Sequence, residues 1–164
     1  YQQETGAEED GLHVLAYRQR DAKIYGAELE LGYNLIEEQS YTVQVTGSAD
    51  FVHARFNNGD VIPRMPATSA NVGIAYLSEM FDVGADVRFV GNKTKVADEV
   101  LPTDDYTNVD LSVTWRPFGY AQDLNVRVQA KNITNSEQRQ HTSFLKDLIP
   151  LPGRTFRFTL NYGF

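Results

Sequence analysis

The sequence predicts an all-β protein built as an antiparallel up-and-down meander of about seven or eight strands. Two observations support this fold class. Apolar and polar residues alternate with a period of two in one segment after another, and the links between these segments alternate between short and long. Period-two alternation is typical of a pleated strand with one apolar face. No segment has a convincing helical period of normal length, so strands are expected to supply the fold.

The first clear strand spans roughly residues 22–34. Tyr25 and Leu29 share its apolar face, whereas Glu28 and Glu30 share its polar face. Five further strands are expected near residues 41–55, 68–77, 83–91, 105–116 and 123–131. A partial strand is expected before residue 22.

The last strand is predicted by the closing stretch TFRFTLNYGF, which alternates without a break. Its apolar positions are Phe156, Phe158, Leu160, Tyr162 and Phe164. Chain ends usually fray, so an aromatic residue at the last position indicates that this strand has a partner.

The links between the strands alternate strictly in length. The short links fall at 35–40, 78–82 and 117–122, and the long links fall at 57–67, 92–104 and 132–153. Outer-membrane barrels have this layout, because their periplasmic turns are short and their extracellular loops are long. The sequence therefore predicts a segment of a transmembrane β-barrel, with apolar faces toward lipid and polar faces toward the lumen.

Aromatic residues are expected to mark the two membrane interfaces. The set beside the short turns and the chain end is Tyr33, Tyr41, Tyr76, Trp115 and Tyr162. Tyr25, Phe51 and Phe89 lie toward the long loops. The alternative is that aromatic residues are simply favourable in strands. The side chains expected to face the lumen are Glu28, Glu30, Asp110, Arg127 and Arg157.

Composition narrows the functional classes. The net charge of −7 argues against a nucleic-acid partner, which would need a basic surface. The absence of cysteine excludes a thiolate metal site or nucleophile. The mean hydropathy is −0.41 and the sequence has no long apolar run, so no membrane-spanning helix is expected. Barrels alternate lipid-facing and lumen-facing residues, so a polar mean hydropathy does not exclude a membrane barrel.

Candidate site residues are few. Weak metal-ligand candidates are His141 and Asp147 in the last long loop and His53 near the top of an upward strand. Ser48, Asp50 and His53 could suggest a hydrolase, but strand parity puts His53 on the opposite face from the other two. We therefore expect no enzyme activity and no cofactor.

The order of the strands suggests an incomplete barrel. Both the first clear strand and the last one run from a long loop toward the short-turn side. Bacterial barrels contain an even number of strands, with both ends in the periplasm. Residues 1–164 are therefore expected to be the C-terminal part of a larger barrel.

Several motifs carry a resemblance to a known family. They are DAKIYGAELELGYNL, NGDVIPRMPATSANVGIAY, LPTDDYTNVDLSVTWRP, and KNIT followed by a loop, PGR and the terminal aromatic strand. In this order the chain resembles the C-terminal barrel portion of TonB-dependent outer-membrane receptors. The combination of HTSFLKD with PGR is most similar to a branch linked to zinc or haem uptake.

The resemblance implies a large barrel around a plug domain, with the plug, the TonB-contact segment and the earlier strands supplied outside these residues. It implies that outer-membrane lipid surrounds the wall and that the barrel-assembly machinery recognises the terminal strand. The function it implies is TonB-energised uptake of an iron–siderophore, haem or zinc. The alternatives are a passive porin-like barrel and a soluble β-barrel that binds a small ligand.

Overall fold

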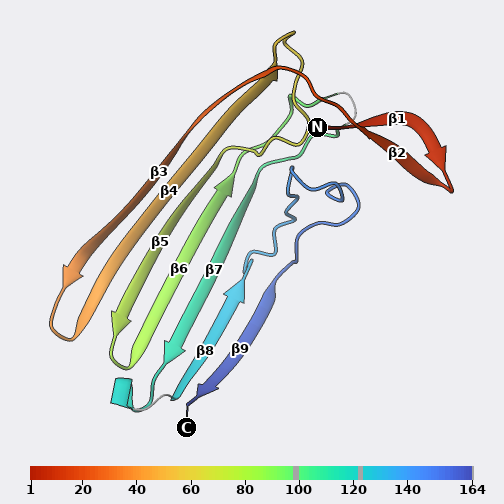
Figure 1. The fold of residues 1–164 in the computed structure, drawn as a ribbon. Helices are drawn as coiled ribbons and strands as arrows, with labels where there is room; N and C mark the ends of the chain where they lie inside the picture. The colour runs from red at the N-terminus through yellow and green to blue at the C-terminus, as the bar shows by residue number, and fades with distance from the viewer. Residues whose placement is uncertain (98–99, 122–123, 164) are drawn as a thin grey trace.

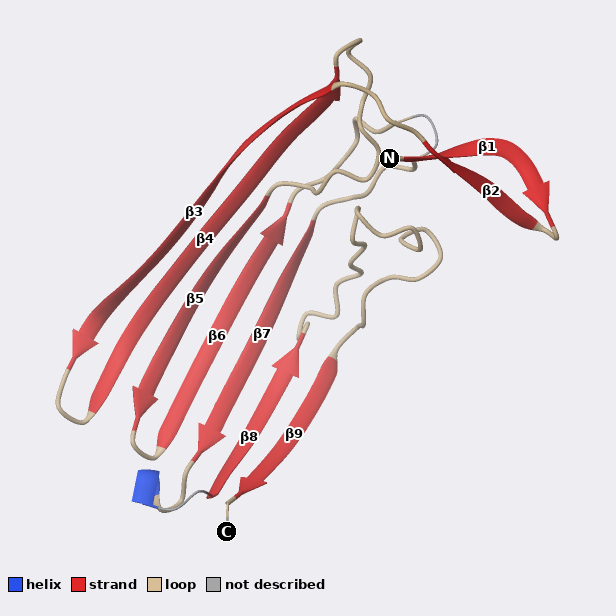
Figure 2. Cartoon of the chain, in the orientation of Figure 1, coloured by secondary structure: helices blue, strands red, loops and turns tan. Residues whose placement is uncertain are grey.

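The computed structural model describes residues 1–97, 100–121 and 124–163. Within these residues the chain forms nine strands and one 3₁₀ turn (Figure 2). The strands are β1 (Gln2–Glu9), β2 (Leu12–Tyr17), β3 (Ala22–Glu37), β4 (Tyr41–Phe56), β5 (Ser69–Ser78), β6 (Phe81–Val90), β7 (Tyr106–Trp115), β8 (Leu124–Lys131) and β9 (Thr155–Tyr162). The 3₁₀ turn is η1 (Gly119–Ala121).

Strands β3 to β9 form one antiparallel sheet in which each strand pairs with its neighbour in the sequence. Figure 1 shows this sheet as a long, tilted wall with the tight turns at one end and the long loops at the other. The prediction of an all-β antiparallel meander is confirmed. No helix in the described part of the chain is long and apolar enough to cross a membrane.

The N-terminal residues differ from the single partial strand that the sequence predicts. They form a separate hairpin, β1–β2, which projects from the loop end of the sheet (Figure 1). Asp10 and Gly11 make its turn, with φ of 52° and 76°. Two successive positive φ values suit the twist of a two-residue hairpin, and Asp-Gly is a preferred pair there. The turn chemistry therefore favours pairing of β1 with β2 as a hairpin.

Strand register sorts the side chains into two faces. Val113 lies opposite Val83 on one side and Val128 on the other, and Val128 lies opposite Phe158. Every strand from β3 to β9 contributes apolar residues to this same face. On the opposite face Ser112 pairs with Gln129, and other polar residues follow. The sheet therefore has one apolar and one polar surface, as the alternation predicts.

The apolar surface is not packed into a core. The buried apolar residues among those described are Ala54, Phe56 and Val100, whereas Phe158 is 69% exposed. A contiguous apolar surface of this extent is unfavourable in water. It suits a wall whose outer face contacts lipid, because lipid removes that surface from water.

The short-turn end carries the five predicted aromatic residues, all on the apolar face. The rings of Tyr41 and Tyr76 stack with centroids 5.3 Å apart. Trp115 and Tyr162 end β7 and β9 at this same edge. Their contact with a membrane interface stays a prediction.

Gly26 provides a test of how closely β3 and β4 approach. A Cβ there would collide with the carbonyl oxygen of Phe51 and lie 3.2 Å from Cα of Val52. A Cβ on Gly32, on the same strand and face, would meet nothing within 4 Å. We expect Gly26→Ala to destabilise the barrel by on the order of 2 kcal/mol, and Gly32→Ala to have little effect.

The measurement is the temperature at which the full-length protein loses its fast-migrating folded band on a gel. The expected result is a lower temperature for Gly26→Ala only. An equal loss in both variants would contradict a close contact specific to Gly26.

Candidate functional site

The three long links lie together at the loop end of the sheet (Figure 1). They connect β4 to β5 (57–68), β6 to β7 (91–105) and β8 to β9 (132–154). Polar side chains rather than an apolar core hold them. Buried polar groups need partners, so their hydrogen bonds show how the site is built.

Asn132 organises the base of the last loop. Its φ is 49°, a left-handed value that asparagine tolerates better than most residues, and it is only 3% exposed. Its backbone N–H donates to the Asp110 carboxylate at 2.9 Å, and its side-chain amide donates to the Ser136 carbonyl at 2.9 Å. The Ser136 hydroxyl in turn donates to the Thr107 carbonyl. The asparagine of the KNIT motif therefore anchors this loop to β7.

His141 lies inside the same loop and joins it to the β6–β7 loop. Its Nδ1 is 3.0 Å from the hydroxyl of Thr103, and both residues are 5% exposed. Lys146, 3% exposed, donates to the Asp147 carboxylate at 2.6 Å. Burial, and then the charges of Lys146 and Lys93, lower the pKa of His141 to about 4. His141 is therefore neutral at physiological pH and forms part of the buried loop structure.

The structure does not bring the metal-ligand candidates together. His53 stacks on Tyr25, with ring centroids 5.0 Å apart, on the apolar face of β4. His141 and Asp147 lie in the last loop. Among the described residues, no group of three or more histidine, aspartate and glutamate side chains could hold a metal ion. The register also sets His53 opposite Tyr25 and Asp50 opposite Glu28, on different faces, as strand parity predicts.

A polar pocket of about 160 Å³ lies where the inner face meets the loops. Arg88 and Tyr106 come from the strands, and Arg139 and His141 come from the last loop. Asp50 also lines it and accepts a hydrogen bond from Ser69. The Arg88 side chain is exposed and lies between Asn71 and Asn108 in the register. A guanidinium in this position can bind carboxylate, phosphate or similar oxygen groups with two parallel hydrogen bonds.

The period-two alternation puts Arg88 on the polar face of its strand, but it does not identify this pocket. Tyr106, Ser69 and Arg139 were not identified as site residues. No local motif marks them, because the pocket forms only when loops far apart in sequence meet over the sheet.

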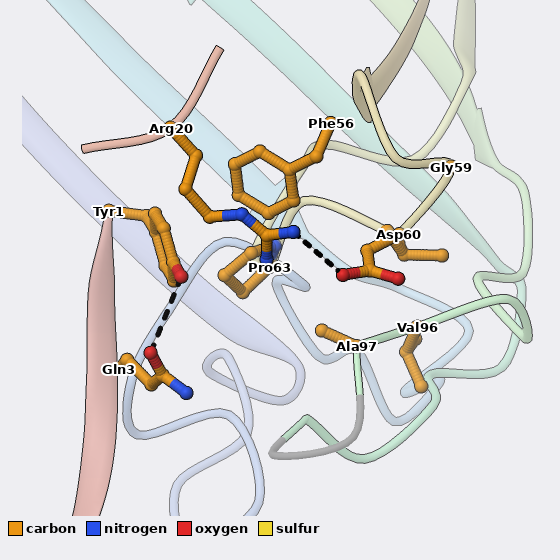
Figure 3. A pocket seen from close by; sticks show the side chains of 10 residues that line it. Tyr1, Gln3, Arg20, Phe56, Gly59, Asp60, Pro63, Val96 and Ala97 are labelled. Atoms are coloured by element: carbon orange, nitrogen blue, oxygen red, sulfur yellow. Dashed lines mark hydrogen bonds and ion pairs between the residues drawn. The ribbon is translucent and has the colours of Figure 1, made fainter. Parts of the chain in front are cut away.

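A second hollow, of about 340 Å³, lies beside the N-terminal hairpin. Figure 3 shows the Arg20 guanidinium beside the Phe56 ring, 4.4 Å from its centroid, with a 2.9 Å ion pair to Asp60. The rings of Tyr1 and Phe56 are 4.9 Å apart. Arg20 already has partners, so this cluster attaches the start of the described chain to the β4–β5 loop.

The predicted lumen-facing charges share the polar face. Glu28 lies opposite Asp50, and Asp110 lies opposite Asp86. Arg127 and Arg157 lie on β8 and β9, opposite Thr159 and Gln129. The inner surface is thus acidic over β3 to β7 and basic over β8 and β9. Carboxylates placed directly opposite each other are unfavourable without a countercharge.

These features define a class: a wall of an outer-membrane barrel, apolar outside and polar inside, with long loops at one end. The sequence model described as TonB dependent receptor-like, beta-barrel matches residues 2–163. The chain therefore belongs to the TonB-dependent receptor family through its β-barrel. This is a family of outer-membrane transport receptors, so the expectation that the chain is not an enzyme agrees with its membership.

A solved structure, the copper transporter OprC, is similar in fold. The TM-score is 0.81 at 18% sequence identity, and the match covers 96% of this chain. It covers 26% of the OprC chain, so the chain spans about a quarter of that protein's length. At this identity the similarity shows the fold alone.

The buried neutral His141 makes the loop sensitive to acid. The folded-state pKa of about 4 lies below the ordinary value of 6.5, so its contribution to stability is complete above about pH 6.5 and falls as the pH drops toward 4. Between pH 7.5 and 5 the loss is about 2 kcal/mol. We expect hydrogen-exchange protection factors in residues 132–154 of the full-length receptor to fall by roughly tenfold or more over this range.

Two variants make this prediction specific. His141→Gln removes the titrating group and should abolish most of the pH effect. His13→Gln removes an exposed histidine of the hairpin and should leave it unchanged. An unchanged pH effect in His141→Gln would show that another group is responsible.

Proposed function

We propose that this chain is the C-terminal wall segment of an outer-membrane receptor that uses TonB to take up a scarce nutrient. The family match over residues 2–163 is the observation that carries the proposal. The described sheet supports the segment assignment, because β3 and β9 are its two end strands and do not pair with each other. Further strands of the same protein would complete the barrel and leave no open sheet edge in lipid.

The long loops and the 160 Å³ pocket are the proposed route of substrate entry. Arg139 lines the pocket, but its guanidinium is held by Glu137 and the Lys146 carbonyl, and the carboxylates of Asp50 and Asp104 also line it. The donors that the pocket offers are the Arg88 guanidinium and the Tyr106 hydroxyl. These groups suit the oxygen atoms of an organic anion better than a bare metal ion, which needs several converging ligands.

The proposed substrate class is therefore a metal complex carried by an anionic organic ligand. Among the nutrients that the sequence suggests, an iron–siderophore or haem fits this chemistry more directly than free zinc. The name of OprC records copper for that protein, so copper complexes belong among the substrates to be tested.

The Arg88 guanidinium provides a direct test of the substrate pocket. A charge-assisted hydrogen bond contributes about 1.5–3 kcal/mol. We expect Arg88→Gln in the full-length receptor to raise the half-saturating substrate concentration by roughly tenfold or more. The maximal uptake rate should stay unchanged. The measurement is uptake of radiolabelled ferric chelates, haem, zinc and copper by cells that lack the chromosomal gene.

The matched control is Arg18→Gln, which removes the same charge from an exposed residue outside the pocket. Equal effects of the two substitutions would contradict a role for Arg88 in binding. Removal of TonB should abolish uptake of whichever substrate is taken up. Uptake that continues without TonB would favour the passive porin-like alternative, and a full-length protein that stays soluble without detergent would favour the soluble barrel.

We also propose that a basic surface of the receptor's own plug domain neutralises the acidic part of the inner face. Glu28 and Glu30 are exposed on β3, and Asp50 and Asp86 face the same way. The opposed carboxylates support the proposal, since a countercharge from outside the sheet would relieve their repulsion.

The double substitution Glu28→Gln and Glu30→Gln tests the plug contact. We expect trypsin to cleave the plug of the purified full-length receptor severalfold faster in this variant, because the plug is held less firmly. The control is Glu8→Gln with Glu9→Gln, which makes the same charge change in the N-terminal hairpin. No difference between the two variants would contradict the contact.

We propose that the barrel-assembly machinery recognises the terminal strand. Phe156, Phe158, Leu160 and Tyr162 lie on the apolar face of β9, opposite Ala130, Val128, Val126 and Leu124. Phe164 lies outside the described residues.

A further inference from the structure

The apolar face changes character at its loop end. Lys23 lies opposite Arg55, and Tyr25 lies opposite His53, in an unbroken register that places all four on the outward side. Tyr25 packs edge-on against Phe51, with ring centroids 6.4 Å apart. Moving toward the loops, the outward face therefore passes from aliphatic residues through aromatic rings to cationic groups.

A pocket of about 250 Å³ opens beside Arg55. Arg55 and His53 line it from β4, Lys93 and Lys95 line it from the β6–β7 loop, and Met65 from the β4–β5 loop contributes an apolar contact. Among the described residues that line this pocket, none is a carboxylate. In a chain with a net charge of −7, a pocket whose described lining gathers cations is a distinct feature.

The cations are held in place but keep free hydrogen-bond donors. Arg55 donates one N–H to the Gly59 carbonyl at 2.9 Å, which leaves the rest of its guanidinium available. Lys93 donates to the Pro66 carbonyl at 2.9 Å, which fixes the loop that carries Lys95. Lys95 itself is exposed. The nearby carboxylate of Asp60 is already paired with Arg20 at 2.9 Å.

We propose that this pocket binds the phosphate groups of a phosphorylated glycolipid in the outer leaflet of the membrane. The proposal rests on the proposed function, because it needs the apolar face to lie in the outer membrane with the long loops outside. The aromatic rings of Tyr25 and Phe51 would then lie at the headgroup level, where such rings are favoured. The cations directly beyond them meet lipid phosphates.

The chemistry favours a lipid over a soluble anion. A guanidinium and ammonium groups around one hollow match a phosphate monoester. The apolar wall below the pocket offers the acyl chains a surface at the same time, so one lipid would contact both regions. A free phosphate could use only the cations. Bound lipid would also shield the outward charges of β3 and β4 from one another.

The test uses the full-length receptor purified in detergent, with diphosphoryl lipid A as the probe. The variant is Arg55→Gln with Lys95→Gln, and the control is Arg18→Gln with Arg154→Gln, which removes two exposed charges elsewhere. We expect the pocket variant to retain at least fivefold less lipid A in native mass spectrometry, and the control to retain the wild-type amount. Equal retention by both variants, or equal loss, would overturn the proposal.

Two further measurements show whether a negative result contradicts the lipid assignment or the proposed function. Inorganic phosphate that competes with lipid A at equal concentration would show a simple anion site and overturn the lipid assignment. Membrane fractionation and the heat-modified gel mobility of each variant are read first. Wild-type protein absent from the outer membrane would contradict the proposed function itself, whereas correctly folded outer-membrane protein with unchanged lipid A retention contradicts only this inference.

Discussion

The continuous hydrogen-bonded ladder from β3 to β9 is the constraint on which the rest of the structure depends. Each strand pairs only with its neighbours in the sequence, so a shift of one residue at any pair would exchange the two faces of every later strand. A shift at the β6–β7 pair, for example, would move Asp110 to the apolar face and Leu111 to the polar face. Burying an unpaired carboxylate in hydrocarbon is strongly unfavourable, and this penalty sets the register more firmly than any single turn.

The same ladder explains why polar groups, not apolar ones, stabilise the loop end. Most of the large apolar side chains of the strands lie on the outward face, and Phe56 is an exception near the loops, so little remains to build a core beneath the loops. Asn132 and Gln138 supply the missing order: Asn132 bonds to the loop's own backbone, and Gln138 donates to Asn108 at 2.9 Å. Because these side chains are shielded from water, their hydrogen bonds are stronger, but leaving any of these groups unpaired would be costly. The loops therefore depend on complete hydrogen bonding for a defined shape.

Much of the fold could be predicted because strand parity is a local property. The faces of Tyr33, Glu30 and Arg157 follow from counting residues in pairs. The β1–β2 hairpin was also readable in principle, since Asp10–Gly11 is a strong turn signal; it was missed because polar and acidic residues around it weaken the alternation. The burial of His141 could not be predicted, because it depends on Thr103 in a different loop.

Whether a charged residue holds an odd or an even position on its strand decides its surroundings more than its place along the sequence does. Asp50 and Arg55 are close neighbours on β4, yet they are an odd number of residues apart and so serve opposite surfaces. Asp50 lies opposite Glu28 on the polar face, whereas Arg55 lies opposite Lys23 at the loop end of the apolar face. A net charge of −7 averages these surfaces and hides both. A single sheet thus keeps two electrostatic environments apart, because its ladder places the anionic groups on the polar face and the cationic groups of β3 and β4 at the loop end of the apolar face.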